Sequence, residues 1–198
     1  MRRLLVASAN RGKLAEITQL LAGLDLEVVG LEAYPDFAPG EEPYETFAAN
    51  AAHKALEAAQ FAGCLALADD SGLEVDALGG RPGVYSARYG RDDAERISKL
   101  LGELADVPPA ARGARFVCAV ALADPAGVIH VWEGRAEGAI TTAPRGEHGF
   151  GYDPVFTQGG RTFAELTPEE KNLVSHRGQA LRACGAELPG VLHGRPEA

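Results

Sequence analysis

Two adjacent carboxylates, Asp69 and Asp70, directly follow the short apolar run 65–68. A hydroxyl and a glycine, Ser71 and Gly72, come next, and apolar and acidic residues then alternate. This pattern predicts a strand, a tight acidic turn and a second strand. Strand ends that face a cleft are the usual ligand sites of α/β proteins, and two carboxylates there can bind a divalent metal or take a proton from water. A solvated Asp-Asp-Ser-Gly turn is the alternative interpretation.

A second candidate site follows the first apolar segment of the chain, which predicts a strand over 3–8. Residues 8–13 read SANRGK, and apolar residues recur at helical spacing from Leu14 onward. The loop therefore precedes a helix N-terminus, whose free N–H groups and positive dipole end favour phosphate, and Lys13 adds a charge. No Walker A motif is present. By itself the pattern equally fits an N-cap followed by a solvated lysine.

The glycine-rich segment 146–154 carries the aromatic residues Phe150 and Tyr152. Glycines on either side of an aromatic residue let the backbone approach a ligand closely. Both rings could stack on a planar base, a contact that contributes about 1–3 kcal/mol. Anchoring of the two rings in the protein core is the alternative interpretation.

A last helix is expected to begin at Pro168 or Glu169, with three cations within two turns of its start: Lys171, His176 and Arg177. Cations near a helix N-terminus oppose the helix dipole. A phosphate or an electronegative base edge nearby would offset that cost. The tail after Leu188 is rich in proline and glycine, so residues 189–198 are expected to be disordered.

Hydrophobic periodicity surrounds these candidate residues with alternating strands and helices. Further strands are expected at 26–30, 115–123, 128–133 and 135–140, and further helices at 44–62 and 92–104. The near-continuous apolar run of 115–123 is typical of a central strand. Lys54 lies on or beside the apolar face of helix 44–62 and could point into a cleft or into solvent.

Length and composition limit the possible classes of protein. The 198 residues, 46% of them hydrophobic, fit one domain, or one domain of two lobes. The formal net charge of −9 argues against a broad nucleic-acid-binding surface but allows a local basic pocket for a phosphorylated ligand. Three scattered cysteines without CxxC spacing predict buried free thiols. No apolar run has the length of a membrane span or a signal peptide, so the expected location is the cytoplasm.

Taken together, these stretches resemble the inosine triphosphate pyrophosphatase family, enzymes that act on the non-canonical purine nucleotides dITP, ITP and XTP. The matching segments, in family order, are SANRGK (8–13), TFAANAAHKA (46–55), DDSGLEVDALGGRPGVYSARY (69–89), GFGYDPVF (149–156) and AELTPEEKNLVSHRGQAL (164–181). They cover nearly the whole chain. One departure is Ala49, where bacterial members commonly carry Glu.

The resemblance implies Mg²⁺-dependent hydrolysis of the α–β phosphate bond to a nucleoside monophosphate and pyrophosphate. In the family's pattern Asp70 is the proton acceptor and a metal ligand. An acid in the loop before the TF helix also holds the metal, by position Glu41, with Glu42 adjacent. The implied substrate-binding residues are Ser8, Ala9, Asn10, Arg11, Gly12 and Lys13 for the triphosphate, Ser71 beside the catalytic acid, and Phe150, Gly151, Tyr152, Asp153, Lys171, His176 and Arg177 for the base.

The expected fold is an α/β domain with a mixed, strongly twisted sheet covered by helices and a long cleft between two lobes. The resemblance also implies a homodimer whose small-molecule partner is a nucleoside triphosphate. Two other functions stay open: a pyrophosphatase for another modified nucleotide, and a nucleotide-sensing module that binds without hydrolysis. A dinucleotide enzyme is poorly supported because the GxGxxG motif is missing.

Overall fold

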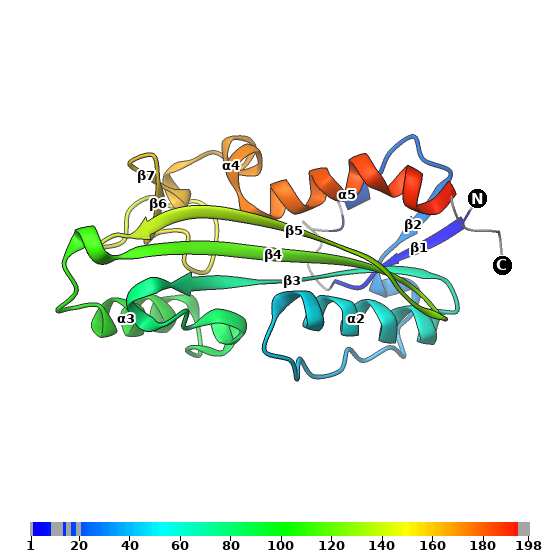
Figure 1. Ribbon diagram of the computed structural model, residues 1–198, viewed down its shortest axis with the longest axis horizontal. Helices are drawn as coiled ribbons and strands as arrows, with labels where there is room; N and C mark the ends of the chain where they lie inside the picture. The colour runs from blue at the N-terminus through cyan, green and yellow to red at the C-terminus, as the bar shows by residue number, and fades with distance from the viewer. Residues whose placement is uncertain (1, 9–13, 15–16, 19–20, 194–198) are drawn as a thin grey trace. The chain divides into compact units, whose positions relative to one another are not determined.

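A computed structural model of the chain describes residues 2–8, 14, 17–18 and 21–193. Within these residues, seven strands form one sheet in the order β2-β1-β3-β4-β5-β6-β7 (Figure 1). The strands are β1 (Arg2–Val6), β2 (Leu26–Val29), β3 (Leu65–Val75), β4 (Gly113–Asp124), β5 (Gly127–Ile140), β6 (Phe156–Gln158) and β7 (Arg161–Thr162). Strand β1 is parallel to β2 and β3, whereas β6 is antiparallel to β5 and β7. The predicted α/β class with a mixed sheet is therefore confirmed.

The α-helices with described bounds are α2 (Phe47–Ala62), α3 (Asp93–Glu103), α4 (Pro168–Val174) and α5 (His176–His193). Helices α2 and α3 begin and end close to the expected residues, whereas the last predicted helix differs, as described below. Short 3-10 turns lie at Leu31–Ala33, Asp76–Leu78, Gly83–Arg88, Pro109–Ala111 and Phe163–Glu165. The helix expected after residue 14 falls largely outside the described residues.

The chain divides into two compact units. Unit 1 comprises Met1–Asp70, Ala119–Glu133 and Ala180–Ala198, and unit 2 comprises Ser71–Cys118 and Gly134–Gln179. Strands β3, β4 and β5 and helix α5 each contribute residues to both units. The expected two-lobed domain with a central cleft stays a prediction.

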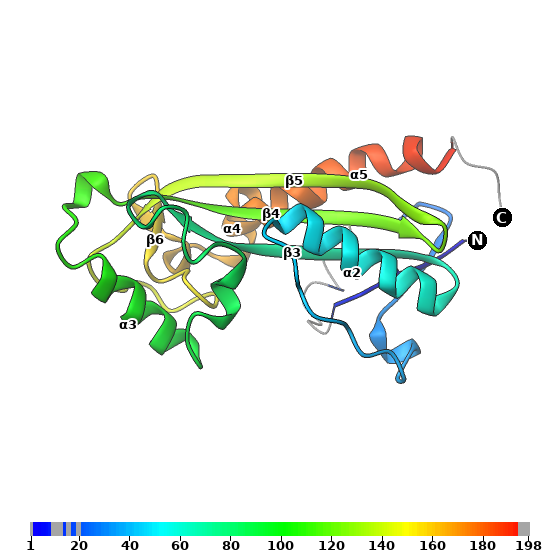
Figure 2. The same cartoon turned by 60° about the horizontal axis from the view of Figure 1, so that its bottom comes forward.

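In unit 1, α2 and α5 lie on opposite sides of the sheet (Figures 1 and 2). Helix α2 begins after Thr46, whose side chain accepts a hydrogen bond from the backbone N–H of Ala49, and it ends at Gly63 in the left-handed conformation. Its buried face is mostly alanine, so the helix lies close to the strands. The two ends of the described chain also meet here, because Arg2 Nη1 donates to the carbonyl of Leu192 at 3.2 Å.

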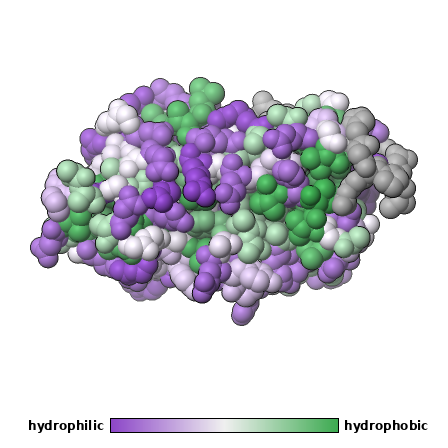
Figure 3. Space-filling model, in the orientation of Figure 1, coloured by the Kyte–Doolittle hydropathy of each residue, from purple (hydrophilic) through white to green (hydrophobic). Residues whose placement is uncertain are grey.

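Unit 2 has an aromatic core. Phe116 on β4 lies 4.7 Å from Phe156 and 5.9 Å from Phe163, measured between ring centroids. Leu100 on α3 and Leu104, which directly follows the helix, add two fully buried residues. Elsewhere on this unit apolar side chains reach the surface, and Figure 3 shows hydrophobic residues over α4, where Leu173 is 72% exposed.

The predicted turn at residues 69–72 is wrong, because β3 runs unbroken from Leu65 to Val75. The strand lies between β1 and β4 in the sheet. The register with β1 covers Leu65–Leu67, so the acidic, glycine-containing segment 69–72 lies beyond it and stays extended as part of the long strand next to β4. Side chains alternate along a strand, so Asp69 and Asp70 point to opposite faces of the sheet. The two carboxylates therefore cannot act as a pair on one face.

Two further element boundaries differ from the prediction. The segments 128–133 and 135–140 form one strand, β5, because Gly134 stays in the ladder next to β4. The last helix is broken at Ser175, which is extended and whose Oγ accepts from the N–H of Gly178 at 3.1 Å. Lys171 consequently lies in the last turn of α4, where the helix dipole stabilises a cation.

The stretch after Leu188 is helical as far as His193, with Pro189 inside α5, so the expected disorder is wrong for residues 189–193. Residues 194–198 lie outside the described part of the chain. The three cysteines are free, as predicted; Cys118 and Cys184 are buried and Cys64 is half-buried. Among the described residues, none of the helices is long and apolar enough to cross a bilayer. The cytoplasmic location stays a prediction.

Candidate active site

Helix α2 and strand β3 bring a lysine to an aspartate in unit 1. Lys54 Nζ lies 3.3 Å from Asp70 Oδ1 and 2.7 Å from Glu42 Oε1. The second oxygen of Asp70, Oδ2, accepts a hydrogen bond from Asn50 Nδ2 at 3.3 Å. One cation, two acids and one amide thus form a single cluster, called the Asp70 cluster below.

The pattern of α2 explains why two of these side chains meet. Asn50 and Lys54 are four residues apart, so they share one face of the helix. Asn50 also fixes the entry of the chain into α2, because its Oδ1 accepts from the N–H of Tyr44 at 2.9 Å and its Nδ2 donates to the carbonyl of Tyr44 at 3.1 Å. The helix, its preceding loop and the carboxylate are therefore held together by one amide.

Burial governs the electrostatics of the Asp70 cluster. The exposed fraction of the side chain is 16% for Lys54 and 9% for Asp70. Burial raises the pKa of Asp70; Lys54 opposes that rise, Glu42 adds to it, and the pKa ends above the ordinary aspartate value. Burial lowers the pKa of Lys54, but the attraction of Asp70 and Glu42 outweighs it and the pKa is raised overall. A buried carboxylate beside a firmly charged lysine is suited to accept a proton.

The structure favours Glu42 over Glu41 for a role in this cluster. Glu42 is half-buried and ion-paired with Lys54, whereas Glu41 is exposed. Asp69 faces the other side of the sheet from Asp70. Sequence reasoning missed Asn50 altogether. A polar residue between the apolar positions of α2, fully buried in the structure, is the signal that could have identified it.

The donor set of the Asp70 cluster fits magnesium in part. The described residues contain no group of three or more His, Cys, Asp or Glu side chains placed to hold a metal ion. Mg²⁺ is commonly held by one or two carboxylates together with substrate phosphates and water, so a full protein cage is not required. Glu42 and Asp70, which both face Lys54, are the carboxylates that could supply the protein ligands.

A second cluster, in unit 2, surrounds the loop 149–153. The side chain of Asp153 is 3% exposed and pairs with Lys171 Nζ. The same oxygen, Asp153 Oδ2, accepts from the N–H of Phe150 at 2.9 Å. Phe150 is 56% exposed as a residue, and Lys171 Nζ lies 4.8 Å from the centroid of its ring. Phe150 therefore presents an accessible aromatic face beside a cation.

Two other predicted contacts of the base are core residues. Tyr152 is 4% exposed, and its hydroxyl donates to the carbonyl of Ser86 at 2.9 Å. The expectation that this ring stacks on a base is wrong, and core anchoring is the correct interpretation for it. His176 is 6% exposed and lies flat on Phe116, with 4.6 Å between ring centroids. Its ring face is therefore already covered.

Arg177, at the start of α5, contacts two predicted site residues in unit 2. Its Nη2 donates to Ser71 Oγ at 3.3 Å, and its guanidinium carbon lies 5.8 Å from the centroid of Phe150. Of the predicted triphosphate loop, Ser8 is half-buried and its N–H donates to the carbonyl of Val6. Residues 9–13 lie outside the described residues.

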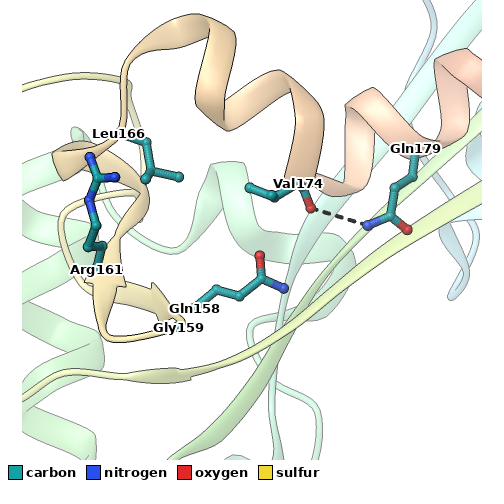
Figure 4. Close-up of a pocket in the computed structure, with 6 residues that line it drawn as sticks. All are labelled: Gln158, Gly159, Arg161, Leu166, Val174 and Gln179. Carbon is teal, nitrogen blue, oxygen red and sulfur yellow. Dashed lines mark hydrogen bonds between the residues drawn. The ribbon is translucent and has the colours of Figure 1, made fainter.

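Unit 2 also has a pocket of about 450 Å³ that none of the predicted site residues lines (Figure 4). It is lined by Gln158, Gly159, Arg161, Leu166, Val174 and Gln179. The amide of Gln179 points to the carbonyl of Val174 at 3.2 Å, and Arg161 pairs with Glu170 at 3.1 Å. The polar groups are already engaged within the protein, which makes this pocket a poor candidate for the site.

The protein is of the α/β class with a mixed sheet, and its buried aspartate–lysine cluster is a candidate acid–base site. The chain belongs to the Ham1 family, whose sequence model matches residues 4–186. It is 55% identical to a dITP/XTP pyrophosphatase of Gloeobacter violaceus over 184 residues, 92% of each chain. It is 51% identical to one of Desulforamulus reducens over 185 residues, 91% of this chain and 92% of the relative. The resemblance drawn from the sequence motifs is confirmed.

Solved structures agree with this family assignment. A HAM1 protein from Coxiella burnetii superposes with a TM-score of 0.91 at 42% identity, covering 96% of this chain and all of the other. A nucleoside-triphosphatase, dITP/XTP pyrophosphatase, from Mycobacterium abscessus gives a TM-score of 0.80 at 48% identity, covering 94% of this chain and 99% of the other. The fold is thus that of the Ham1 proteins.

Proposed function

We propose that this protein hydrolyses non-canonical purine nucleoside triphosphates, namely dITP or ITP and XTP or dXTP, to the nucleoside monophosphate and pyrophosphate. The relatives named dITP/XTP pyrophosphatases, at about half identity over most of both chains, support the substrate class. The observation that carries the chemistry is the buried Asp70, whose pKa is raised by burial and which lies 3.3 Å from Lys54. In such a pair Asp70 can accept a proton, and Lys54 beside it can stabilise negative charge.

Asp70 accepts the proton of the attacking water in this proposal. The water oxygen forms a bond to phosphorus at the α–β linkage, the bridging P–O bond breaks, and pyrophosphate leaves. A proton acceptor with a pKa above the ordinary aspartate value takes the proton more readily. Lys54 keeps Asp70 ionised before the step and compensates charge on the phosphate oxygens during it.

Magnesium is proposed as the metal. Glu42 and Asp70 would hold the ion, which when bound neutralises phosphate charge and lowers the pKa of water. Asn50 fixes the orientation of Asp70 through its 3.3 Å hydrogen bond to Oδ2. Without that amide the carboxylate could rotate toward Lys54 with both oxygens. The SANRGK loop, 8–13, is proposed to bind the triphosphate.

The loop 149–153 is proposed to read the base. Phe150 offers an exposed ring for stacking, and Arg177 lies beside it. Hypoxanthine and xanthine carry a 6-oxo acceptor where adenine carries an amino donor. A site that donates hydrogen bonds at this position leaves its donors unpaired against adenine, at a cost of about 1–3 kcal/mol each. By resemblance to the family, we also propose that the protein forms a homodimer and that it is cytoplasmic.

A panel of triphosphates with pyrophosphate detection, run with and without Mg²⁺, tests the function. Rapid pyrophosphate release from ITP, dITP and XTP, slow release from ATP and GTP, and none in EDTA would support it. A preference for a modified pyrimidine triphosphate would show that the proposed purine substrates are wrong. Ligand-induced stabilisation without any pyrophosphate would instead identify a nucleotide sensor.

The metal ligand is tested by a matched pair of neighbouring substitutions, Glu42→Gln and Glu41→Gln. Glu42→Gln is expected to raise the Mg²⁺ concentration needed for half-maximal rate by about tenfold or more, because a neutral amide is a weaker ligand than a carboxylate. Glu41→Gln should leave that concentration within about twofold of wild type, since Glu41 is exposed. If Glu41→Gln raises the Mg²⁺ requirement and Glu42→Gln does not, Glu41 is the metal ligand.

A further inference from the structure

One carboxylate outside the loop 149–153 fixes the loop to helix α3. Asp93, the first residue of α3, accepts a hydrogen bond at Oδ2 from the N–H of Gly151, with 2.7 Å between the two atoms. Phe150 donates its own N–H to Asp153 at 2.9 Å. The two peptide groups that flank the Phe150 Cα atom are therefore each held by a carboxylate.

The loop needs such restraint because of its sequence. Gly149 and Gly151 flank Phe150 with φ of 79° and 62°, a region in which glycine is conformationally free. A side chain at Gly149 would collide with the carboxylate of Asp153. The two glycines thus allow close packing but do little to fix the backbone of the loop. The hydrogen bonds to Asp93 and Asp153 restrain it instead.

Asp93 is itself held in place. Its second oxygen, Oδ1, pairs with Arg96 Nη1 at 2.7 Å, and Arg96 Nε donates to the carbonyl of Gly90 at 3.3 Å. Asp93 also lies in the first turn of α3, where a negative charge is favoured by the helix dipole. Its side chain is 45% exposed, so it is a surface anchor rather than part of the core.

We propose that Asp93 is a positioning residue for base discrimination: it holds the Phe150 ring where a purine stacks and does not touch the substrate itself. The inference rests on the proposed role of the loop as the reader of the base. Stacking and hydrogen-bond selection both depend on sub-ångström placement, and a displaced ring would accept adenine and hypoxanthine more evenly.

The test measures kcat and KM for ITP and for ATP in Asp93→Ala. The ratio of kcat/KM for ITP over ATP is expected to fall about five- to tenfold, a part of what one hydrogen bond to a charged acceptor contributes, because the loss acts on base choice only through the position of the ring. The loss should lie mainly in KM for ITP. Asp93→Asn keeps an oxygen for the N–H of Gly151 and should restore the ratio to within about twofold of wild type.

The neighbouring residue Asp92 offers a matched control. Its Oδ1 caps α3 by accepting from the N–H of Glu95 at 2.8 Å. Asp92→Ala weakens the helix start without removing the bond to Gly151, so the ITP/ATP ratio should stay unchanged. An equal fall in Asp92→Ala and Asp93→Ala would overturn the inference, because helix stability alone would explain both.

Phe150→Ala separates this inference from the proposed function. If Phe150→Ala abolishes the preference for ITP while Asp93→Ala leaves it intact, only the positioning role of Asp93 is overturned. If neither substitution changes the ratio, the loop does not read the base, and both the loop's role and this inference are wrong. Absence of pyrophosphate release from wild type would refute the hydrolase itself.

Discussion

The two units each contain a buried aspartate–lysine pair, and the pairs differ in what else the carboxylate binds. In unit 1, the partners of Asp70 within the described part of the chain are the side chains of Asn50 and Lys54, and Lys54 is shared with Glu42 at 2.7 Å. In unit 2, Asp153 accepts a backbone N–H, that of Phe150, in addition to Lys171. The proposed function needs the first carboxylate to exchange a proton, whereas the second holds the backbone of a loop. Identical residue types are thus proposed to serve chemistry in one place and geometry in the other.

Asp70→Asn should have the largest effect. Removing the proton acceptor is expected to lower kcat by about 10³-fold or more, at the upper end of what general base catalysis contributes. Asp69→Asn is the matched control, since Asp69 points to the opposite face of the sheet, and it should retain most of the activity. Pyrophosphate release under saturating ITP measures both. A folded, fully active Asp70→Asn protein would show that the Asp70 cluster is structural.

The same variant should be as stable as wild type at neutral pH, or more stable. The pKa of Asp70 is raised in the folded state, so its contribution to stability is fully present below the unfolded pKa and is lost as the pH rises through the folded pKa. At pH 7 the ionised carboxylate therefore costs stability that Asn does not. Urea unfolding at pH 7 checks the prediction, and a clear loss of stability in Asp70→Asn would contradict it.

Lys54→Met should have the next largest effect and should move the pH profile. Loss of the buried cation is expected to lower kcat/KM by about 10²-fold, because it stabilises developing charge in a buried site. Lys54 also opposes the rise of the Asp70 pKa, so the acidic limb of kcat/KM, if Asp70 sets it, should shift to higher pH in Lys54→Met than in wild type. If the acidic limb of the kcat/KM profile does not move, a group other than Asp70 sets it.

These contrasts also explain which parts of the structure the sequence could predict. Periodicity located the central strand β4 and the helices α2 and α3 to within a few residues, since their apolar faces are long and regular. The turn at Asp69–Gly72 was predicted wrongly because the local propensity of acidic and glycine residues is overridden by the long strand β3 that forms next to β4. The break at Ser175 carries a weak signal, since serine caps helices but also occurs within them.

The candidate site was predictable to a similar depth. The motif around Asp70 singled out the segment that carries the Asp70 cluster, and Lys54 was placed on or beside the apolar face of its helix. That Glu42 rather than Glu41 pairs with Lys54 could not be read from the sequence, because adjacent loop residues have no periodicity that tells which one turns inward. The burial of Tyr152 could not be read locally either, because the carbonyl that its hydroxyl contacts belongs to Ser86, 66 positions away in the chain.

Asp153→Asn tests the clamp and should be milder than either change in unit 1. The amide can still accept the N–H of Phe150, but the pairing with Lys171 is weakened. We expect KM for ITP to rise about tenfold with kcat changed less, and the free energy of unfolding to fall by about 1–3 kcal/mol. Initial rates and urea unfolding measure the two effects. A kcat loss as large as that of Asp70→Asn would remove the contrast between the two pairs.

Arg177→Ala should produce the smallest effect, limited to the choice of base. Arg177 contacts Ser71 Oγ at 3.3 Å and lies beside the Phe150 ring, so its loss removes one candidate donor without releasing the loop. We expect the ITP/ATP ratio of kcat/KM to fall about threefold, a fraction of the cost of one unpaired buried donor. Arg177→Lys keeps the charge but not the planar fork, and it should give the same fall if geometry rather than charge selects the base. Equal losses on both nucleotides would show that Arg177 holds the substrate without choosing it.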